Sequence, residues 1–283
     1  MNRTGLDRSA LAYWETRSTH WRVSTPISPR PEDIRYYEAN AARHSGEADE
    51  LELDALLLGV TPAIAAMRWP AGTRLVALDW SAGMLRNVFP RASVTVFARP
   101  LLGDWREMPL AEASVDFVAG DGCYSTFANL ESAVLVNREV ARVLRPGGSF
   151  CVRCHRRLDA TPPMEQLFGR LLAGEFRDLD MFRWQLAMSL HGDSRDGVCL
   201  GDAWKAWHEH VPDTRRLQAR LGWTDDAIAN LESWKDSHSR YFFPTLAELR
   251  ALASAEFELE DVDVPEYEWG EHFPRLTMRR PGR

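Results

Sequence analysis

The sequence lacks any apolar stretch long enough to cross a membrane. Its most apolar window, near Leu56 to Met67, is interrupted by Gly59 and Pro62, whereas a transmembrane helix needs about 20 consecutive apolar residues. The first residues, M-N-R-T-G-L-D-R-S, contain no apolar run and no cleavage site of the kind that secretory signals carry. We therefore expect a cytoplasmic protein that has no membrane partner.

The sequence also lacks an excess of positive charge. Its 34 Lys and Arg residues are outnumbered by 41 Asp and Glu residues, which gives a formal net charge of -7. Proteins that bind nucleic acids use a basic surface to contact phosphates. The charge balance therefore argues against a nucleic-acid partner and favours a small-molecule substrate. It leaves a protein substrate and the oligomeric state open.

Cysteine is scarce, with four residues in a chain of 283. Cys151 and Cys154 have the spacing of a C-x-x-C metal or redox site, but no second cysteine pair or nearby histidine pair completes a zinc site. Their segment is expected to be a strand, in which an odd separation directs two side chains to opposite faces. We expect reduced, structural thiols and no metal site.

The stretch from Leu56 to Asp79 predicts a strand, a tight turn, a short helix and a second strand. The apolar run L-L-L at 56–58 is typical of a strand that is buried on both faces of a parallel sheet. Gly59 permits a close approach between the backbone and a ligand. Asp79, at the tip of the second strand, can accept hydrogen bonds from ribose hydroxyls. Such a βαβ unit typically binds a nucleoside-containing cofactor.

The rest of the chain alternates between strand and helix patterns, apart from one long segment. Further strands are expected at 92–97, 114–121, 149–155, 257–264 and 276–279, and helices at 130–144 and after the capping box of Thr245 and Glu248. This alternation predicts a doubly wound, mostly parallel α/β sheet. Between about 161 and 243, apolar residues instead follow the spacing of four or five helices.

We expect four parts in the chain. They are an N-terminal helical lid at 1–46, a Rossmann-like cofactor-binding core at 47–160, an all-helical insertion that caps the substrate at 161–244, and a core-completing helix with the last two strands at 245–283. Within the first part, Pro31 begins a helix, because proline suits the first helical position. That helix fits a lid and a simple packing role about equally well.

Five motifs together carry a resemblance to a known family. They are L-L-L-G-V-T-P at 56–62, A-L-D-W-S-A-G-M-L at 77–85, G-D-W-R-E-M-P-L at 103–110, S-V-D-F-V-A-G-D-G at 114–122 and V-A-R-V-L-R-P-G-G at 140–148. Over about 50–155 the chain resembles the class I S-adenosylmethionine-dependent methyltransferases. The resemblance implies a seven-stranded Rossmann-like sheet and S-adenosyl-L-methionine as the cofactor. It also implies methyl transfer, for which the charge balance favours a small-molecule acceptor; oxygen and nitrogen are preferred over carbon as the acceptor atom, which the sequence leaves open.

The resemblance assigns cofactor contacts to residues at or beyond the strand ends. Asp79 would hold the ribose diol, Asp104 would accept from the adenine amino group beside Trp105, and Asp121 would receive the amino-bearing tail. The full set of cofactor contacts is Gly59, Val60, Thr61, Pro62, Asp79, Trp80, Met84, Asp104, Trp105, Asp121 and Gly122. The family usually carries a Gly-x-Gly-x-Gly loop after the first strand. Here only Gly59 is present, and Thr61 is the residue expected to meet the methionine carboxylate.

Catalysis in such an enzyme needs an aligned acceptor and, for some acceptors, a base. His155 is the first candidate for that base, because it ends the strand at 149–155 and should face the crevice. Tyr124, Ser125 and Asp121 are alternative substrate contacts from the loop after the strand at 114–121. Most tryptophans of the insertion should be core residues, and the others should line an aromatic pocket for a flat, apolar or cationic substrate.

Two other functions are compatible with these patterns. A nicotinamide-dependent oxidoreductase would also use the separation between Gly59 and Asp79, although the later glycines of its fingerprint are missing. A binding protein that has lost catalysis on the same fold is the other alternative, since a fold does not fix a function.

Overall fold

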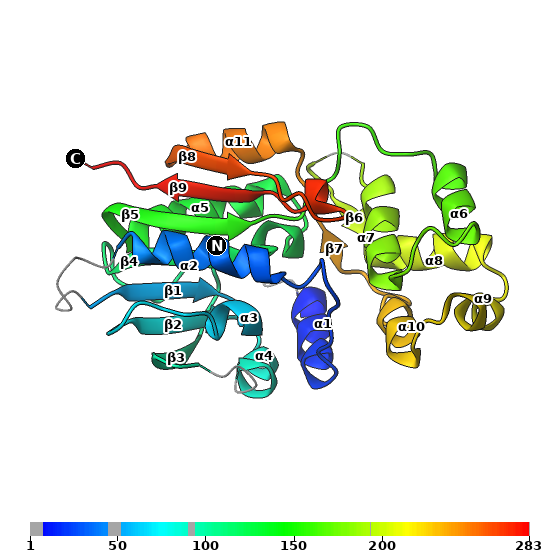
Figure 1. Cartoon of the computed structure of the whole chain (residues 1–283), viewed down its shortest axis with the longest axis horizontal. Coiled ribbons are helices and arrows are strands. Elements are labelled where there is room, and N and C mark those ends of the chain that lie inside the picture. Colours follow the sequence, from blue (N-terminus) through cyan, green and yellow to red (C-terminus); the bar gives the residue numbers. More distant parts are fainter. Residues whose placement is uncertain (1–7, 45–51, 90–93, 193, 283) are drawn as a thin grey trace.

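A seven-stranded sheet forms the centre of the computed structural model, which describes residues 8–44, 52–89, 94–192 and 194–282 (Figure 1). The strands lie in the order β3-β2-β1-β4-β5-β9-β8. Neighbours among the first five are parallel, whereas β9 runs antiparallel to both β5 and β8. The bounds are β1 Asp54–Leu58, β2 Arg74–Asp79, β3 Phe97–Leu102, β4 Val115–Asp121, β5 Leu144–Arg153, β8 Glu258–Asp263 and β9 Arg275–Arg279. The predicted doubly wound, mostly parallel sheet is confirmed.

Alternate residues of β1 pack against different helical layers. Leu56 and Leu58 pack in the layer of α5 and α11, whereas Ala55 and Leu57 pack in the layer of α2, α3 and α4. Because successive strand side chains point to opposite faces, a strand covered on both sides needs a continuous apolar run. The helices are α2 Pro31–Ala42, α3 Pro62–Ala65, α4 Ala82–Asn87, α5 Leu130–Val143 and α11 Leu246–Ser254.

In the C-V-R-C segment at 151–154, successive side chains also point to opposite faces of the sheet. Cys151 is buried with the α2 layer and Cys154 with the α5 layer, so the two thiols lie on opposite faces of the sheet. Both are free, as are Cys123 and Cys199. The prediction that these two thiols lie on opposite faces of the sheet is confirmed.

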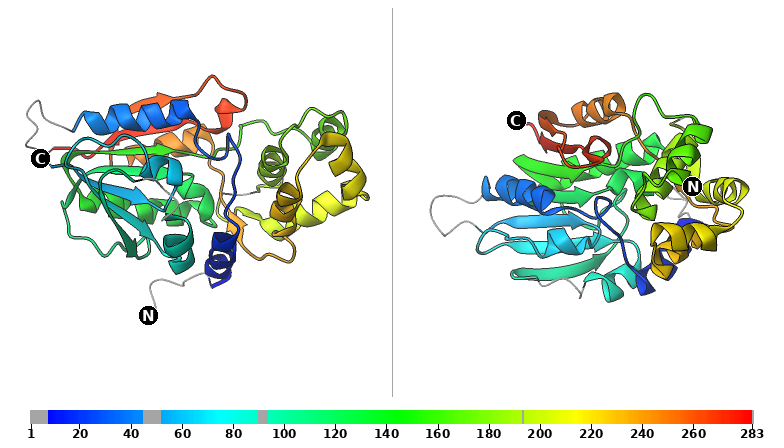
Figure 2. Two further views of the ribbon diagram at one scale, coloured as in Figure 1. Left: turned by 60° about the horizontal axis from the view of Figure 1, so that its bottom comes forward. Right: turned by 45° about the vertical axis from the view of Figure 1, so that its right-hand side comes forward.

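The insertion lies beyond the carboxyl ends of β1 and β2, and α1 (Arg8–Thr19) lies beside it (Figures 1 and 2). Its own core contains Phe182, Leu186, Trp207 and Trp234. Its helices are α6 Met164–Leu172, α7 Leu179–Ser189, α8 Leu200–His210, α9 Thr214–Leu221 and α10 Asp225–Glu232. The segment is not purely helical, because β6 (Val198–Cys199) pairs antiparallel with β7 (Arg240–Tyr241). In the described ranges, no helix is both long enough and apolar enough to cross a membrane.

The prediction of the third strand at 92–97 was wrong. Residues 92 and 93 lie outside the described residues, and the strand that pairs with β2 is β3, Phe97–Leu102. β3 is an edge strand whose side chains are mostly exposed, so burial imposes no apolar pattern on it. It contains Pro100, a residue that edge strands tolerate because one side of their backbone needs no partner.

Candidate active site

Two adjoining cavities lie where the carboxyl ends of β1, β2 and β4 meet α1 and the insertion. We call the smaller one, of about 70 Å³, the strand-tip chamber, and the larger one, of about 310 Å³, the aromatic chamber. Both are lined by Trp14, Trp21, Thr61, Asp121 and Thr126. The strand-tip chamber is also lined by Leu58, Gly59, Val60, Asp79, Trp80, Met84 and Trp105. The aromatic chamber is also lined by Tyr13, Arg17, Val23, Ile27, Ser28, Pro29, Pro62, Ala63, Gly122, Ser125, His155, Arg183, Trp184, Trp234 and Tyr241.

Gly59 forms the turn that opens the strand-tip chamber. Its φ of +88° lies in the left-handed region, and its N–H donates to the carbonyl of Leu78 at 2.7 Å. A Cβ at this position would lie 3.3 Å from the Trp105 ring and 3.8 Å from Oδ2 of Asp79. One glycine therefore provides both the positive φ and the bare backbone at the chamber wall. Pro62 then begins α3, as its position after the turn predicts.

Asp79 ends β2 and lines the strand-tip chamber as a buried carboxylate. Its Oδ1 accepts a hydrogen bond from the N–H of Ser81 at 2.8 Å, while the Ser81 hydroxyl accepts from the N–H of Met84 at 3.1 Å. Burial raises the pKa of Asp79 to about 7, and the nearby Glu15 also raises it. Ser81 therefore caps α4 as expected, and the Asp79 side chain remains at the chamber wall.

Trp105 and Asp104, adjacent in the sequence, have different surroundings. The Trp105 indole donates to the carbonyl of Leu78 at 2.6 Å, and its ring lies against Gly59 at the chamber wall. Asp104 lines neither chamber, and its carboxylate is paired with the Arg106 guanidinium at 2.6 Å. The structure therefore brings the Trp105 ring to the proposed cofactor site but does not bring Asp104 there.

The N-terminal segment closes both chambers. Trp14 of α1 and Trp21, which follows that helix, line each of them. Glu15 fixes α1 to the sheet domain, because its Oε1 accepts from the Ser81 hydroxyl at 2.8 Å and from the N–H of Gly83 at 3.0 Å. By contrast, α2 packs on the sheet through the buried Tyr37. The covering element is thus α1 with the segment after it, and α2 has the packing role.

Asp121, at the end of β4, is neutralised by a buried arginine. Nε of Arg153 lies 2.7 Å from Oδ1 of Asp121, and the Arg153 side chain is fully buried. Burial raises the pKa of Asp121, and the charge of Arg153 opposes that shift. Because Asp121 already has a cationic partner, it offers less attraction to a second cation than its position after the strand predicts.

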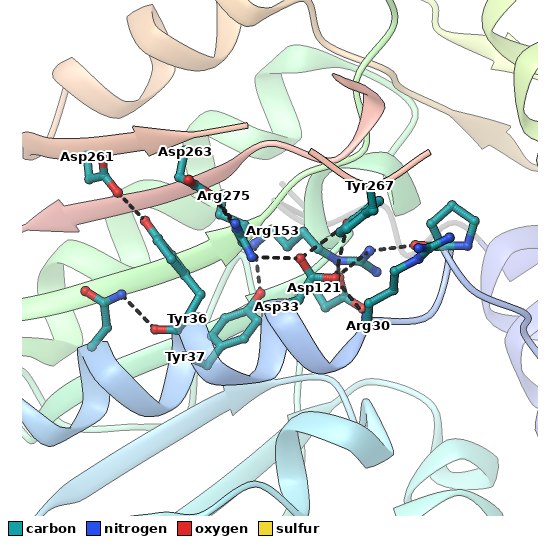
Figure 3. A network of polar contacts seen from close by, with 12 residues as sticks. Arg30, Asp33, Tyr36, Tyr37, Asp121, Arg153, Asp261, Asp263, Tyr267 and Arg275 are labelled. Atoms are coloured by element: carbon teal, nitrogen blue, oxygen red, sulfur yellow. Dashed lines mark hydrogen bonds and ion pairs between the residues drawn. The ribbon is translucent and has the colours of Figure 1, made fainter. Parts of the chain in front are cut away.

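The same arginine joins the N-terminal segment to the sheet. Figure 3 shows Arg153 next to Asp33 of α2, at 3.6 Å, and Asp33 is also paired with Arg275 of β9 at 3.2 Å. Arg153 also donates to the carbonyls of Pro26, at 2.6 Å, and Ile27. The segment that covers the chambers is therefore anchored by a buried network of charges.

His155 lines the aromatic chamber and has a defined tautomer. The Ser125 hydroxyl donates to the carbonyl of Gly122 at 2.7 Å, and its oxygen lies 3.2 Å from Nδ1 of His155. A hydroxyl has one hydrogen, so Ser125 accepts from Nδ1–H, and Nε2 of the neutral ring carries a lone pair. Burial, aided by Arg153, lowers the pKa of His155 well below its usual value. The ring is therefore neutral near pH 7.

Nε2 of His155 has no hydrogen-bond partner in the described part of the chain. The ring is held edge-on by Trp184 and Phe273, at centroid distances of 4.8 and 5.3 Å. Gly122, with a φ of +62°, makes room for it, since a Cβ there would lie 2.5 Å from the imidazole. His155, a residue of the chamber wall, therefore holds an unprotonated Nε2 in a fixed position.

The prediction that Tyr124 contacts the substrate needs correction. Its hydroxyl donates to Oδ1 of Asn137 at 2.7 Å, and its ring is buried in the layer of α5. Cys123–Thr126 form a single turn of 3-10 helix, so its residues face different sides. Ser125 and Thr126 reach the chambers, whereas Tyr124 faces the core.

Several site residues were not identified from the sequence. Trp14, Trp21 and Thr126 come from segments whose apolar or polar patterns carry no site signal. The sequence does carry a signal for Arg153. A charged residue inside the apolar strand F-C-V-R-C must find a buried partner. Among the described residues, no group of three His, Cys, Asp or Glu side chains is arranged to hold a metal ion.

One family model matches part of the chain. Residues 56–152 match the model of a family described as "Methyltransferase domain". No curated protein matches the chain.

Three solved structures share the fold of the chain. CcbJ methyltransferase from Streptomyces caelestis is 15% identical with a TM-score of 0.54, over 95% of this chain and 98% of that one. A Burkholderia thailandensis 1,6-didemethyltoxoflavin-N1-methyltransferase is 14% identical with a TM-score of 0.52, over 97% and 88%. A Rhodobacter sphaeroides protein, described as a suggested Zn-dependent alcohol dehydrogenase, is 15% identical with a TM-score of 0.59, over 97% and 98%. At these identities the likeness concerns the fold alone.

Proposed function

We propose that this protein, whose core is that of a class I S-adenosylmethionine-dependent methyltransferase, methylates an oxygen or nitrogen atom of a small-molecule acceptor. The observation that carries the proposal is His155, a residue of the chamber that adjoins the Gly59–Asp79 site, whose buried Nε2 has no partner among the described residues. The Burkholderia protein of similar fold was solved with 1,6-didemethyltoxoflavin and S-adenosylhomocysteine. That likeness supports a small-molecule acceptor here.

The strand-tip chamber, of about 70 Å³, has groups that suit the ribose of the cofactor, although a whole nucleoside needs more space than it holds. Gly59 exposes its backbone there, Asp79 offers a carboxylate for the ribose hydroxyls, and Trp105 offers its ring as part of the wall. When bound, S-adenosylmethionine supplies a methyl group whose bond to a positively charged sulfur breaks as its bond to the acceptor atom forms. Thr61, Asp121 and Thr126 line both chambers, so we place the methionine end of the cofactor beside them.

His155 then acts as the proton acceptor. Nδ1–H is held by Ser125, so Nε2 is the nitrogen that takes the proton from the acceptor O–H or N–H. Burial disfavours a charged imidazole, but a bound sulfonium cofactor would lose its positive charge in the same reaction, which would offset the new charge on His155. The total charge of the site would therefore stay the same, because the positive charge would move from the cofactor sulfur to the His155 imidazole.

Ligand binding tests the cofactor assignment. Purified protein is heated with S-adenosylmethionine, S-adenosylhomocysteine or NADH, and the unfolding midpoint is followed. A ligand at a hundredfold excess over its dissociation constant stabilises the fold by about 2.7 kcal/mol. We expect both sulfur compounds to stabilise the protein. No response to either would overturn the proposal, and stabilisation by NADH alone would favour the oxidoreductase. Binding without methyl transfer to any acceptor would favour a binding protein.

Gly59→Ala tests the turn. Alanine at φ +88° costs about 1–2 kcal/mol of folding free energy, and its methyl group would press on Trp105. We expect S-adenosylhomocysteine to bind about tenfold more weakly, as measured by calorimetry. Gly72→Ala is the matched control, since Gly72 has a φ of +75° but its Cβ would meet only Glu52, at 3.9 Å. Equal affinity for the two variants would contradict the assignment of Gly59.

His155→Gln tests the base. Glutamine keeps a polar side chain but does not accept the proton, so we expect kcat to fall by about 10²–10⁴. Affinity for S-adenosylhomocysteine should stay within about twofold. The rate is measured as transfer of a radiolabelled methyl group to the best acceptor of a panel. His208→Gln, on the outside of α8, serves as the control. A normal kcat in His155→Gln would remove His155 from the mechanism.

A further inference from the structure

Buried polar atoms that lack partners are concentrated in residues that line the aromatic chamber. Nine buried side-chain nitrogen and oxygen atoms of the described residues have no hydrogen-bond partner, and four of them belong to residues that line this chamber. They are Nε of Arg183, Nε1 of Trp184, Nε1 of Trp234 and Nε2 of His155. Buried polar groups in native proteins are almost always paired, so this concentration points to a ligand.

The four atoms are chemically unequal. Nε of Arg183 and the indole nitrogens of Trp184 and Trp234 are donors only. Nε2 of His155 is an acceptor in the tautomer that Ser125 imposes. A matching ligand therefore presents acceptor oxygens to three N–H groups and one donor to His155. That donor is the O–H or N–H that becomes methylated in the proposed reaction.

The charge balance of the chamber favours an anion. Among the lining residues, Asp121 is neutralised by Arg153, at 2.7 Å, and Arg183 is neutralised by Asp180, at 2.6 Å. Arg17 also lines the chamber, and it has no carboxylate partner in the described part of the chain. Its guanidinium binds Asn230 and the carbonyl of Arg22 instead. One positive charge of the wall is therefore uncompensated.

The shape of the chamber favours a flat molecule. Its walls include the rings of Trp14, Trp21, Trp184, Trp234 and Tyr241. Its volume of about 310 Å³ equals that of about ten water molecules, which is enough for one or two fused rings with short substituents. Aromatic walls pack best against planar aromatic surfaces.

We infer that the methyl acceptor is a planar aromatic acid. An ionised oxygen-acid group such as a carboxylate binds the N–H groups of Arg183, Trp184 and Trp234, and a hydroxyl or amine on the same ring system faces His155. This inference rests on the proposed methyl transfer for the role of His155. The binding of an acid in the chamber does not depend on the proposed methyl transfer.

Matched pairs of acids and amides test the inference. The probes are 2-, 3- and 4-hydroxybenzoate and 6-hydroxy-2-naphthoate, each paired with its primary amide, which has nearly the same shape but no charge. Binding to the full chain is measured by calorimetry with and without saturating S-adenosylhomocysteine. We expect at least one acid to bind about tenfold or more tightly than its amide.

Variants assign that preference to the chamber wall. Arg183→Met should reduce the preference to less than about threefold, and Trp234→Phe, which keeps a ring but loses the N–H, should weaken acid binding about threefold. Arg250→Met removes one exposed charge from α11 and should change nothing beyond twofold. If Arg183→Met does not fold, Trp234→Phe still tests the wall.

The outcomes separate the two proposals. Equal binding of acids and amides, no binding of any acid at millimolar concentration, or an unchanged preference in the wall variants would overturn the aromatic acid. Failure of both S-adenosylmethionine and S-adenosylhomocysteine to bind would overturn the methyltransferase proposal instead. If an acid binds more tightly than its amide but neither sulfur compound binds, the acid-binding site is supported and the methyltransferase proposal is overturned.

Discussion

Arg153→Met is expected to lower the free energy of unfolding by about 3–5 kcal/mol. The substitution leaves the carboxylate of Asp121 buried without its guanidinium partner, and it removes the donors to Pro26 and Ile27. Methionine fills a similar volume, so packing changes little. Denaturation by urea, followed by circular dichroism, measures the effect. The loss should shrink at acidic pH, because a protonated Asp121 no longer needs a cation.

The matched control lies on the same strand. Arg145 of β5 also bonds two carboxylates, those of Asp54 and Asp116, at 2.9 and 2.7 Å, but its side chain is 40% exposed. Exposed ion pairs contribute about 0–1 kcal/mol, so Arg145→Met should cost far less. The double variant Arg153→Met/Asp121→Asn should recover part of the stability, since no buried charge is left at that pair. Equal losses for Arg153→Met and Arg145→Met would show that the buried network does not stabilise the fold.

Asp79→Asn is expected to weaken binding of S-adenosylhomocysteine about tenfold or more at pH 8, because asparagine lacks the charge that strengthens hydrogen bonds from the ribose hydroxyls. The same variant should be more stable than the native protein without ligand. Burial raises the pKa of Asp79 from 3.8 to about 7. Protonated Asp79 therefore stabilises the fold relative to its ionised form. This stabilisation is complete below the unfolded pKa of 3.8 and is lost as the pH rises through the folded pKa of about 7. The loss amounts to about 4 kcal/mol, and asparagine avoids it.

Two measurements check the behaviour of Asp79. Calorimetry of the native protein should show affinity for S-adenosylhomocysteine rising by roughly tenfold from pH 6 to pH 8, as Asp79 ionises, and a much flatter profile in Asp79→Asn. Urea denaturation at pH 8 should show the variant to be the more stable protein without ligand. Asp104→Asn is the control, because Asp104 lines neither chamber. A native affinity that is independent of pH would show that Asp79 does not contact the cofactor.

Local patterns predicted the parts of the site that lie on regular elements. R-L-V-A-L-D is β2, Arg74–Asp79, as expected, and the capping box of Thr245 and Glu248 begins α11. These elements are specified by residues close in the sequence, namely an apolar run, a turn and a cap. In β2 the charged residues Arg74 and Asp79 stand at the two ends of the apolar run, so the position of Asp79 at the strand end follows from the sequence.

The errors concern directions of side chains and long-range partners. Asp104 bonds Arg106, two residues further on, and no strand period determines which way an acid turns after a strand ends. Tyr124 and Ser125 are adjacent, yet one faces the core and the other a chamber. Arg153 meets Asp33, which is 120 residues away in the sequence. No local rule brings those two charges together.

The position of β9 between β5 and β8 affects the synthesis of the chain. β5 ends at Arg153, but its antiparallel partner β9 is complete only at Arg279, after the insertion has been made. At about 5–20 residues per second, a ribosome needs roughly 6–25 s to cover that interval. For that time β5 is the edge of a five-stranded sheet, with Phe150 and Val152 in a strand that has no outer neighbour. An open apolar edge of this kind is a site of aggregation, so β5 is exposed to pairing with other chains during synthesis and protected from it once β9 is in place.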